Sequence, residues 1–254
     1  SELTCMGISR DGKYKEEDLL EAARTVGKYI KKINGIKVLE LAMGRGANSY
    51  YLAQKFSKVK FYGIDISKGQ LDYAFKKAGK INNYYPNFGD YHNLKKFKDG
   101  TFDIVFVIEA LCHSLHKEKV LTEACRVLKK GGIFIIFDGY ANKSPIESTN
   151  KERTALKLTE KGMALEKFES YRSFIKKAKK QFKVESEEDV SQFILPTMER
   201  FERISSIFFK FPILAKLISF FFPKQFIYNT ISGYLSSLLI KNRICIYMVT
   251  ILKK

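Results

Sequence analysis

The stretch that decides the fold is VLELAMGRGANS, residues 38–49. Apolar residues run to Leu41, an acid lies near the end of that run at Glu40, and two glycines, Gly44 and Gly46, follow with one residue between them. Glycines here let the backbone turn tightly and let a ligand approach without a Cβ atom in the way. A strand that ends in this way and feeds a helix is typical of a nucleotide-cofactor site, although such glycine turns also occur without a ligand.

A second apolar run, KFYGID at residues 60–65, ends in an acid. Asp65 stands about 20 residues after the glycines, where a carboxylate can accept hydrogen bonds from both hydroxyls of a ribose. A dinucleotide site would carry a third glycine where this chain has Ser49, and an acid before the loop is badly placed for a pyrophosphate. Glu40 instead suits a cationic cofactor, which favours S-adenosylmethionine over NAD.

Three further motifs follow in order: FGDYHNL at residues 88–94, DGTFDIVFVIE at 99–109 and RVLKKGG at 126–132. Together with the first two motifs, they resemble the class I S-adenosylmethionine-dependent methyltransferases over residues 36–140. The resemblance implies an α/β fold, namely a Rossmann-like doubly wound sheet of seven strands whose last strand is antiparallel. It also implies S-adenosylmethionine as cofactor and S-adenosylhomocysteine as product.

The resemblance assigns the methionine end of the cofactor to the first loop. Glu40 and the backbone of Ala42, Gly44 and Gly46 would line this end. The chain departs from the usual pattern at Ala42, where family members carry glycine. A methyl group at this place is tolerable, but it narrows the site.

The later motifs would hold the rest of the cofactor. Asp65 would bind the ribose, with Ile66 beside the adenine. Asp90 would accept a hydrogen bond from the adenine amino group, and Tyr91 would pack nearby. Glu109, at the end of the fourth strand, would face the methionine part or the acceptor. The alternative for each acid is a solvated strand end or, for Asp90, a plain turn.

The segment VIEALCHS, residues 107–114, has a narrower resemblance to the loop after strand four in sterol and tocopherol methyltransferases and their small-molecule relatives. It makes His113 a candidate general base or acceptor-orienting group, together with Glu109 as a second catalytic candidate, because a neutral imidazole can take a proton near neutral pH. The alternative is that His113 caps the following helix or hydrogen-bonds a loop carbonyl. His92 and His116 are expected at the surface.

The order of elements predicts three parts. Residues 1–34 would form an N-terminal helical cap, residues 35–190 with 242–254 the cofactor-binding core, and residues 191–241 a helical insertion before the final strand. Alternating strands and helices through the core favour a parallel sheet with helices on both faces.

Several residues outside the motifs are candidates for contact with the acceptor. Asp138 and Tyr140 follow a strand at the edge where open α/β sheets bind ligands, although a turn role is equally open. Tyr14 would close over the site from the N-terminal segment. Phe208 and Phe211 would contribute from the insertion.

The insertion is intensely apolar between residues 204 and 222, but lysines and prolines interrupt it, so a membrane-spanning helix is not expected. Arginines and lysines stand beside its large apolar side chains. Three readings stay open: a lid over an oily substrate pocket, a helix lying in a lipid headgroup layer, and an ordinary insertion that buries its phenylalanines in the core.

The chain of 254 residues carries a formal net charge of +18. This charge favours RNA or an anionic membrane surface as partner, or it reflects a lysine-rich composition alone. The four cysteines show no paired or metal-ligand spacing, and residues 1–18 are too polar for a secretory signal. We expect a cytoplasmic protein with peripheral membrane contact as an option, and no metal.

These features predict transfer of a methyl group to a small, largely apolar acceptor such as an isoprenoid, sterol, quinone or other lipid-like compound. The alternatives are methylation of RNA or protein, and N- or O-methylation of a small polar phosphobase or natural product. The loop EALCH after strand four differs from the Asn-Pro-Pro-Tyr type that base methylation favours, so nucleic acid is the weaker alternative. The sequence leaves the oligomeric state open.

Overall fold

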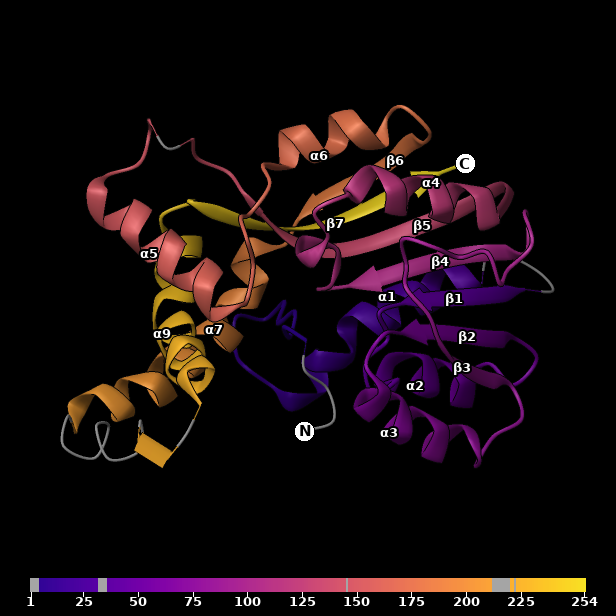
Figure 1. The fold of residues 1–254 in the computed structure, drawn as a ribbon, viewed down its shortest axis with the longest axis horizontal. Coiled ribbons are helices and arrows are strands. Elements are labelled where there is room, and N and C mark those ends of the chain that lie inside the picture. Colours follow the sequence, from indigo (N-terminus) through magenta and orange to yellow (C-terminus); the bar gives the residue numbers. More distant parts are fainter. Residues whose placement is uncertain (1–4, 32–35, 145, 212–219, 222) are drawn as a thin grey trace.

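The computed structural model describes residues 5–31, 36–144, 146–211, 220–221 and 223–254 (Figure 1). Seven strands form one sheet in the order β3-β2-β1-β4-β5-β7-β6. The strands are β1 (Lys37–Leu41), β2 (Lys60–Asp65), β3 (Tyr84–Phe88), β4 (Phe102–Ile108), β5 (Leu128–Ala141), β6 (Lys183–Asp189) and β7 (Cys245–Lys253).

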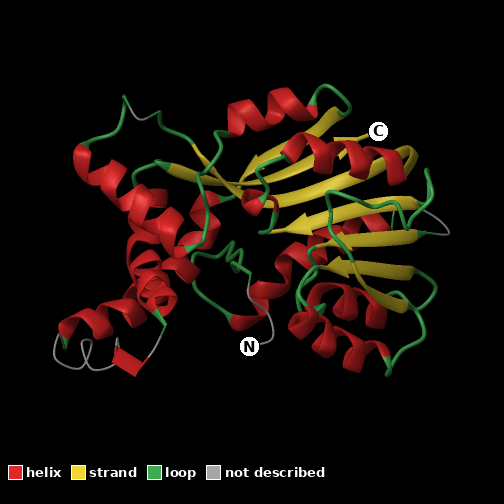
Figure 2. Cartoon of the chain, viewed as in Figure 1, coloured by secondary structure: helices red, strands yellow, loops and turns green. Residues whose placement is uncertain are grey.

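The helices flank this sheet and extend beyond one end of it (Figure 2). They are η1 (Glu16–Leu20), α1 (Glu21–Ile30), α2 (Ala47–Lys55), α3 (Lys68–Ala78), η2 (Leu111–His113), α4 (Lys117–Val127), α5 (Asn150–Gly162), α6 (Tyr171–Ala178), α7 (Ser191–Lys210) and α9 (Lys224–Lys241).

The predicted sheet is confirmed: β1 to β5 pair in parallel, and β7 runs antiparallel between β5 and β6. The central strands are apolar on both faces, as in β4, whose first six residues are all buried. A strand with this pattern needs helices on both sides. Helices α1, α2 and α3 cover one face, and α4 and α6 cover the other.

The site is positioned by the strand order at the middle of the sheet. From β1 the chain proceeds outward to β2 and β3, whereas β4 returns to the other side of β1 and continues to β5. The loops after β1 and β4 therefore leave in opposite directions, which opens a crevice at the carboxyl ends of these two strands.

The predicted insertion forms helices α7 and α9, and α5 packs with them at one end of the sheet (Figure 1). Gly162 at the end of α5 lies so close to α9 that a Cβ atom there would come within 2.4 Å of the carbonyl oxygen of Tyr228. We call α5, α7 and α9 the cap helices. The sequence boundaries placed α5 with the core, while residues 212–219 and 222 of the apolar run lie outside the described residues.

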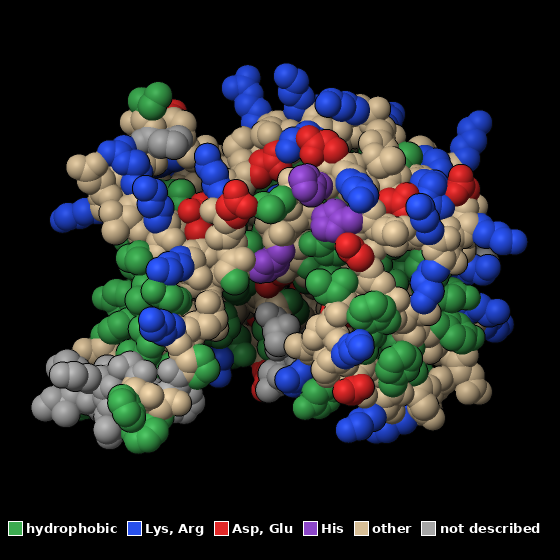
Figure 3. Space-filling view, viewed as in Figure 1, with side chains coloured by type: hydrophobic (Ala, Val, Ile, Leu, Met, Phe, Trp, Pro, Cys, Tyr) green, Lys and Arg blue, Asp and Glu red, His purple; other side chains and the backbone are tan. Residues whose placement is uncertain are grey.

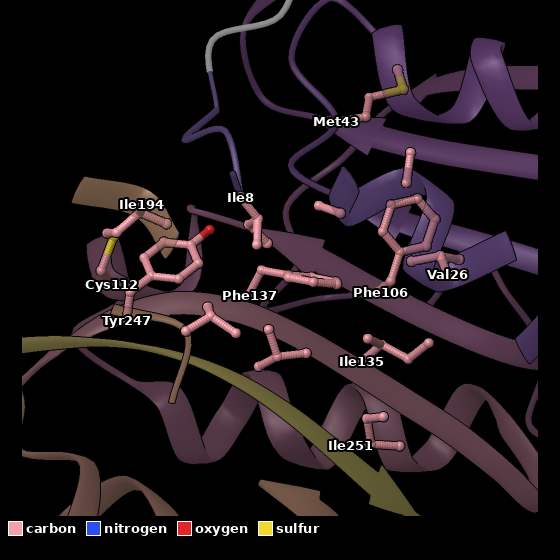
Figure 4. Packing of buried hydrophobic residues seen from close by; sticks show 14 of the residues in the cluster. Ile8, Val26, Met43, Phe106, Cys112, Ile135, Phe137, Ile194, Tyr247 and Ile251 are labelled. Carbon is pink, nitrogen blue, oxygen red and sulfur yellow. The ribbon is translucent and has the colours of Figure 1, made fainter. Parts of the chain in front are cut away.

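Large apolar side chains join the cap helices to the sheet. Ile194 of α7 and Tyr247 of β7 belong to the same buried cluster as Cys112 and Phe137 (Figure 4). On the opposite face, a second buried cluster contains Phe134 and Phe174. The end of the sheet beside the cap helices is therefore part of a continuous hydrophobic core.

Candidate functional site

The loop after β1 turns by means of three residues in the left-handed region: Ala42 with φ 51°, Gly44 with φ 55° and Gly46 with φ 69°. The position of Gly46 also leaves no room for a side chain, because a Cβ atom there would lie 1.8 Å from the hydroxyl oxygen of Tyr84. The positive φ of Ala42 explains why the related pattern carries glycine at this place.

Glu40 lies buried under this loop and is held by the start of α2. Its carboxylate accepts hydrogen bonds from the backbone N–H of Ser49 (3.1 Å), from the Ser49 hydroxyl and from the side-chain amide of Asn48 (3.3 Å). Burial raises the pKa of Glu40 to about 7, although these donors lower it. A positively charged ligand beside Glu40 would favour its ionised form.

Asp65 joins the ends of β1 and β2. Its Oδ2 accepts from the backbone N–H of Gly44 (2.8 Å), and its Oδ1 accepts from the backbone N–H of Ser67 (2.8 Å). A carboxylate offers about four lone-pair positions, so it can accept further hydrogen bonds from a ligand in this geometry.

Two neighbouring cavities lie along this crevice. The loop cavity, of about 180 Å³, is lined by residues that include Glu40, Gly44 and Glu109. The edge cavity, of about 370 Å³, is lined by residues that include Asp65 and Asp90. Because Ala42 and Ala110 line both cavities, the two form adjoining halves of one crevice. Eight of the nine predicted cofactor residues line the crevice: Glu40, Ala42, Gly44, Asp65, Ile66, Asp90, Tyr91 and Glu109. Gly46 is not among the residues that line either cavity, and its role is in the turn of the loop.

His92 is a site residue that sequence reasoning placed at the surface. Its Nδ1 lies 2.7 Å from Asp90 Oδ1, and its Nε2 lies 2.8 Å from the hydroxyl oxygen of Ser114. His92 is half-buried, so it is partly at the surface as expected, but it also lines the edge cavity. The histidine fixes one carboxylate oxygen of Asp90 and lowers its pKa, together with the backbone N–H of His92. The sequence feature that could have identified His92 as a site residue is its position two residues after Asp90.

Glu109 turns the chain directly after β4 with a positive φ of 53°. Its backbone N–H donates to the carbonyl of Phe137 in β5 (2.8 Å). Its Oε1 accepts from the backbone N–H of Met6 (2.6 Å) and from the hydroxyl of Tyr247 (2.8 Å). Burial raises the pKa of Glu109 to about 7, whereas these two donors lower it. The carboxyl can therefore exchange a proton near neutral pH.

A third cavity, of about 300 Å³, lies between the sheet edge and the cap helices, and we call it the cap cavity. Most of its lining is apolar. It consists of Met6, Glu109, Cys112, His113, Asp138, Gly139, Thr159, Met163, Phe168, Ile194, Met198, Ser236, Leu239, Ile240, Cys245, Ile246 and Tyr247. Glu109 lines both the cap cavity and the loop cavity, so its side chain stands at their boundary.

His113 lies at the end of η2, is exposed, and lines both the cap cavity and the edge cavity. The three histidines of the chain gather on one face of the molecule (Figure 3). His113 is thus accessible from both cavities. The predicted alternative, that His113 caps the following helix, is not the arrangement seen, because His116 occupies that position before α4.

Asp138 lies within β5, not after its end as predicted; it lines the cap cavity, but both of its carboxylate oxygens have structural partners. Oδ2 accepts from the backbone N–H of Cys112 (2.8 Å), and Oδ1 accepts from the N–H of Gly139 (2.8 Å). Burial raises the pKa of this carboxyl. Asp138 therefore anchors η2, the turn that carries His113.

The prediction for Tyr140 was wrong. Its side chain lies on the other side of the sheet, where its ring contacts Tyr171 and Phe174 at centroid distances of 5.1 and 5.0 Å. Side chains along β5 alternate between the two faces of the sheet, and Tyr140 lies on the face of Phe134 and Ile136, against α6.

Tyr14, Phe208 and Phe211 also lie outside the lining of the cap cavity. Tyr14 packs under the guanidinium of Arg200, 4.8 Å from the ring centroid. Phe208 contacts Phe226 with ring centroids 6.2 Å apart, and Phe211 is exposed. The N-terminal segment and the insertion do reach the cavities, but through other residues: Cys5, Met6, Ile194, Met198, Leu239 and Ile240.

The central part of the chain, residues 39–136, matches a family model described as a methyltransferase domain. This part of the chain is a class I methyltransferase domain. It contains the loop after β1, Asp65 at the end of β2, the residues that line the edge cavity and the turn at Glu109. The sequence-based recognition is therefore confirmed for this domain.

Curated relatives of the methyltransferase domain include sterol-type enzymes. The chain is 34% identical over 148 residues to "Sterol methyltransferase-like 2" of Botryococcus braunii, which covers 54% of this chain and 37% of that protein. It is 30% identical over 167 residues to "24-methylenesterol C-methyltransferase 3" of Arabidopsis thaliana, a match that covers 64% of this chain and 46% of that protein. The chain thus spans less than half the length of these two relatives.

Solved structures share the fold over nearly the whole chain. A putative sarcosine dimethylglycine methyltransferase from Galdieria sulphuraria superposes with a TM-score of 0.74 at 17% identity, covering 98% of this chain and 92% of that one. Geranyl diphosphate C-methyltransferase from Streptomyces coelicolor A3(2) superposes with a TM-score of 0.70 at 13% identity, and the match covers 99% of this chain and 92% of that one. The cap helices therefore belong to an arrangement that other proteins with this fold share.

Proposed function

We propose that the chain transfers a methyl group from S-adenosylmethionine to a small, largely apolar acceptor and releases S-adenosylhomocysteine. The observation that carries this proposal is the position of Glu109, which lines both the loop cavity and the cap cavity. A cofactor in one cavity and an acceptor in the other would meet at this residue, as an in-line displacement at the methyl carbon requires.

The crevice fits the cofactor by the chemistry of its donor set. Glu40 would face the cationic methionine end, and Asp65 would accept from the ribose hydroxyls while keeping its bonds to Gly44 and Ser67. Ile66, Tyr91 and the Asp90–His92 pair would surround the adenine. When bound, the cofactor supplies an electrophilic methyl group on a sulfonium.

The residues of the chain would contribute mainly by positioning the acceptor and excluding water. The apolar walls of the cap cavity would hold the acceptor against the boundary at Glu109. Glu109, with a pKa of about 7, would accept the proton that the acceptor loses. His113 would orient a polar group of the acceptor from the opposite side.

The lining of the cap cavity supports an uncharged or cationic acceptor. It brings two carboxyl groups, Glu109 and Asp138, to a mostly apolar wall, and its described residues include neither lysine nor arginine. A diphosphate such as that of geranyl diphosphate would need cations to balance it. Sterol-like and other isoprenoid compounds therefore fit better than phosphorylated ones, in line with the names of several relatives.

A labelling experiment tests this function directly. The purified chain is incubated with methyl-labelled S-adenosylmethionine and a lysate of its source cells. The organic-soluble, RNA, protein and aqueous small-molecule fractions are then counted separately. We expect label in the organic fraction, at a level that Glu109→Gln reduces strongly.

The other fractions distinguish the alternatives. Label in RNA or protein would overturn the proposal of a small acceptor. Label in the aqueous fraction would indicate a polar amine, for which the carboxyl groups of Glu109 and Asp138 would supply the charge balance. One relative with 31% identity is named sarcosine/dimethylglycine N-methyltransferase, from Halorhodospira halochloris.

A further inference from the structure

Helix α7 exposes an apolar stripe beyond the part that lines the cap cavity. Ile204 and Ile207 lie one turn apart on α7, and Phe211 follows directly after the last residue of this helix; each of the three is more than half exposed (54%, 58% and 57%). Phe209, Phe220 and Phe221 are exposed nearby in the chain. We call five of these residues the tip patch: Ile204, Ile207, Phe211, Phe220 and Phe221. Phe209 is left out because its ring packs against Tyr234 of α9, with ring centroids 5.4 Å apart.

The tip patch is unusual for a protein surface that faces only water. Scattered single apolar residues need no explanation, whereas several large ones gathered at one end of a molecule mark an interaction surface. In the space-filling view, hydrophobic side chains gather at the left of the molecule, over the cap helices (Figure 3).

The charges on α7 indicate what kind of surface the apolar stripe would bind. Arg203 and Lys210 are exposed beside the apolar stripe. The acids of the same helix turn toward α9: Glu199 pairs with Lys241 at 2.7 Å, and Glu202 accepts a hydrogen bond from Ser237. The stripe is therefore bordered by positive charge, and the chain as a whole carries +18. An apolar surface with a basic border fits an anionic lipid surface.

The same helix also reaches the cap cavity. Ile194 and Met198 line that cavity, and Ile207 follows Met198 by about 13 Å along the helix axis at 1.5 Å per residue. A helix whose far end lay 5–10 Å deep in a headgroup layer would thus hold the cavity close to the membrane.

We propose that the tip patch docks the protein on the surface of an anionic lipid bilayer. The docking is peripheral: among the helices that the structure describes, none has the length and low charge needed to cross a membrane. The phenylalanines and isoleucines would enter the acyl boundary, and Arg203 and Lys210 would meet the headgroups. This proposal concerns binding alone and does not depend on the reaction.

Vesicle sedimentation tests the proposal with the full chain. Vesicles of pure phosphatidylcholine are compared with vesicles that contain phosphatidylglycerol as well. We expect binding to the anionic vesicles, weak binding to the neutral ones, and loss of binding as salt is raised. Ile207→Ser with Phe211→Ser should weaken the binding by about tenfold or more, because two apolar side chains no longer enter the lipid.

Matched variants on the opposite side of the molecule serve as controls. Phe75→Ser changes a phenylalanine of α3 that is 52% exposed, and Lys58→Glu is the control for Lys210→Glu. We expect binding to survive both control changes and to fall with Lys210→Glu. Equal loss in the controls, no binding to either vesicle, or tip-dependent formation of dimers in sedimentation velocity without vesicle binding would each overturn the proposal.

Discussion

The hydroxyl of Tyr247 donates a hydrogen bond of 2.8 Å to Glu109, across 138 positions of the chain. Tyr247 belongs to β7, the antiparallel strand between β5 and β6, whereas Glu109 follows β4. The bond therefore joins the cofactor-binding half of the sheet to the half beside the cap helices. It also gives the boundary between the loop cavity and the cap cavity a fixed geometry.

This bond predicts a shift in the pH profile of methyl transfer. Glu109 acts as a base only when ionised, so the rate should rise with pH through about 7 and then level off. Tyr247→Phe removes a donor that lowers the pKa of Glu109, so the profile should move to higher pH. Measurement of kcat/KM against pH checks both curves. Glu109→Gln should abolish the rise, and a wild-type profile that is flat between pH 5 and 9 would contradict the assignment of Glu109 as base.

Asp65→Ala should weaken binding of S-adenosylhomocysteine. The substitution removes charge-assisted hydrogen bonds to the ribose. The binding free energy should weaken by on the order of 2 kcal/mol, which raises Kd about thirtyfold. Isothermal titration calorimetry measures the change. Asp72→Ala, which removes an exposed acid of α3, is the control and should leave Kd unchanged. Equal affinities for wild type and Asp65→Ala would remove Asp65 from the site.

His113→Ala should slow turnover but leave the affinity for S-adenosylhomocysteine unchanged. The side chain lines the cap cavity, where the acceptor would lie, as well as the edge cavity, but none of the proposed hydrogen bonds to the cofactor involves it. Single-turnover rates and calorimetry separate the two effects. His116→Ala is the matched control in the same loop, and full activity of His113→Ala would show that His113 has no role in the reaction.

Glu40 should make the free energy of unfolding depend on pH. Burial raises its pKa in the folded state from 4.5 to about 7. As pH rises through this interval, the unfolded chain loses the proton before the folded chain does, so ionisation of Glu40 destabilises the fold. The stability of the wild type relative to Glu40→Gln should therefore fall by roughly 2 to 3 kcal/mol between pH 5 and 8. Urea unfolding measures this difference, and a difference that does not change with pH would contradict it.

Gly46→Ala should destabilise the fold more than Gly44→Ala. Both residues have a positive φ, which costs a residue with a side chain about 1–2 kcal/mol. At Gly46 the new Cβ atom would also collide with the hydroxyl of Tyr84, whereas at Gly44 it meets nothing within 4 Å. Urea unfolding of both variants gives the comparison, and equal losses would mean that the collision relaxes at no cost.

The sheet and the crevice could be predicted because their signals are local. Buried parallel strands appear as apolar runs, and the turn at Gly44 and Gly46 needs residue types that few other structures require. The positions of Glu40 and Asp65 follow from the same runs, since the carboxyl ends of neighbouring parallel strands meet at one edge.

The acceptor side could not be predicted in the same way. Tyr140 was misplaced because an apolar run buried on both faces does not indicate which residues face the cavity. Met6 and Tyr247 contact Glu109 from distant parts of the chain, and nothing local in the sequence marks them. Phe208 and Phe211 were predicted to contact the acceptor because they are apolar. The residues of α7 that line the cap cavity are instead Ile194 and Met198, which lie earlier in the helix.

Different elements of the fold build the two sides of the crevice. The cofactor half is made of loops anchored to the central strands, whereas most of the acceptor wall comes from α5, α7, α9 and the strand β7 that follows them. Exchange of the cap helices with those of a relative would reshape the acceptor wall without altering Glu40, Gly44 or Asp65. Under the proposed function, a chimaera of this kind should methylate the acceptor of the relative that supplied its helices.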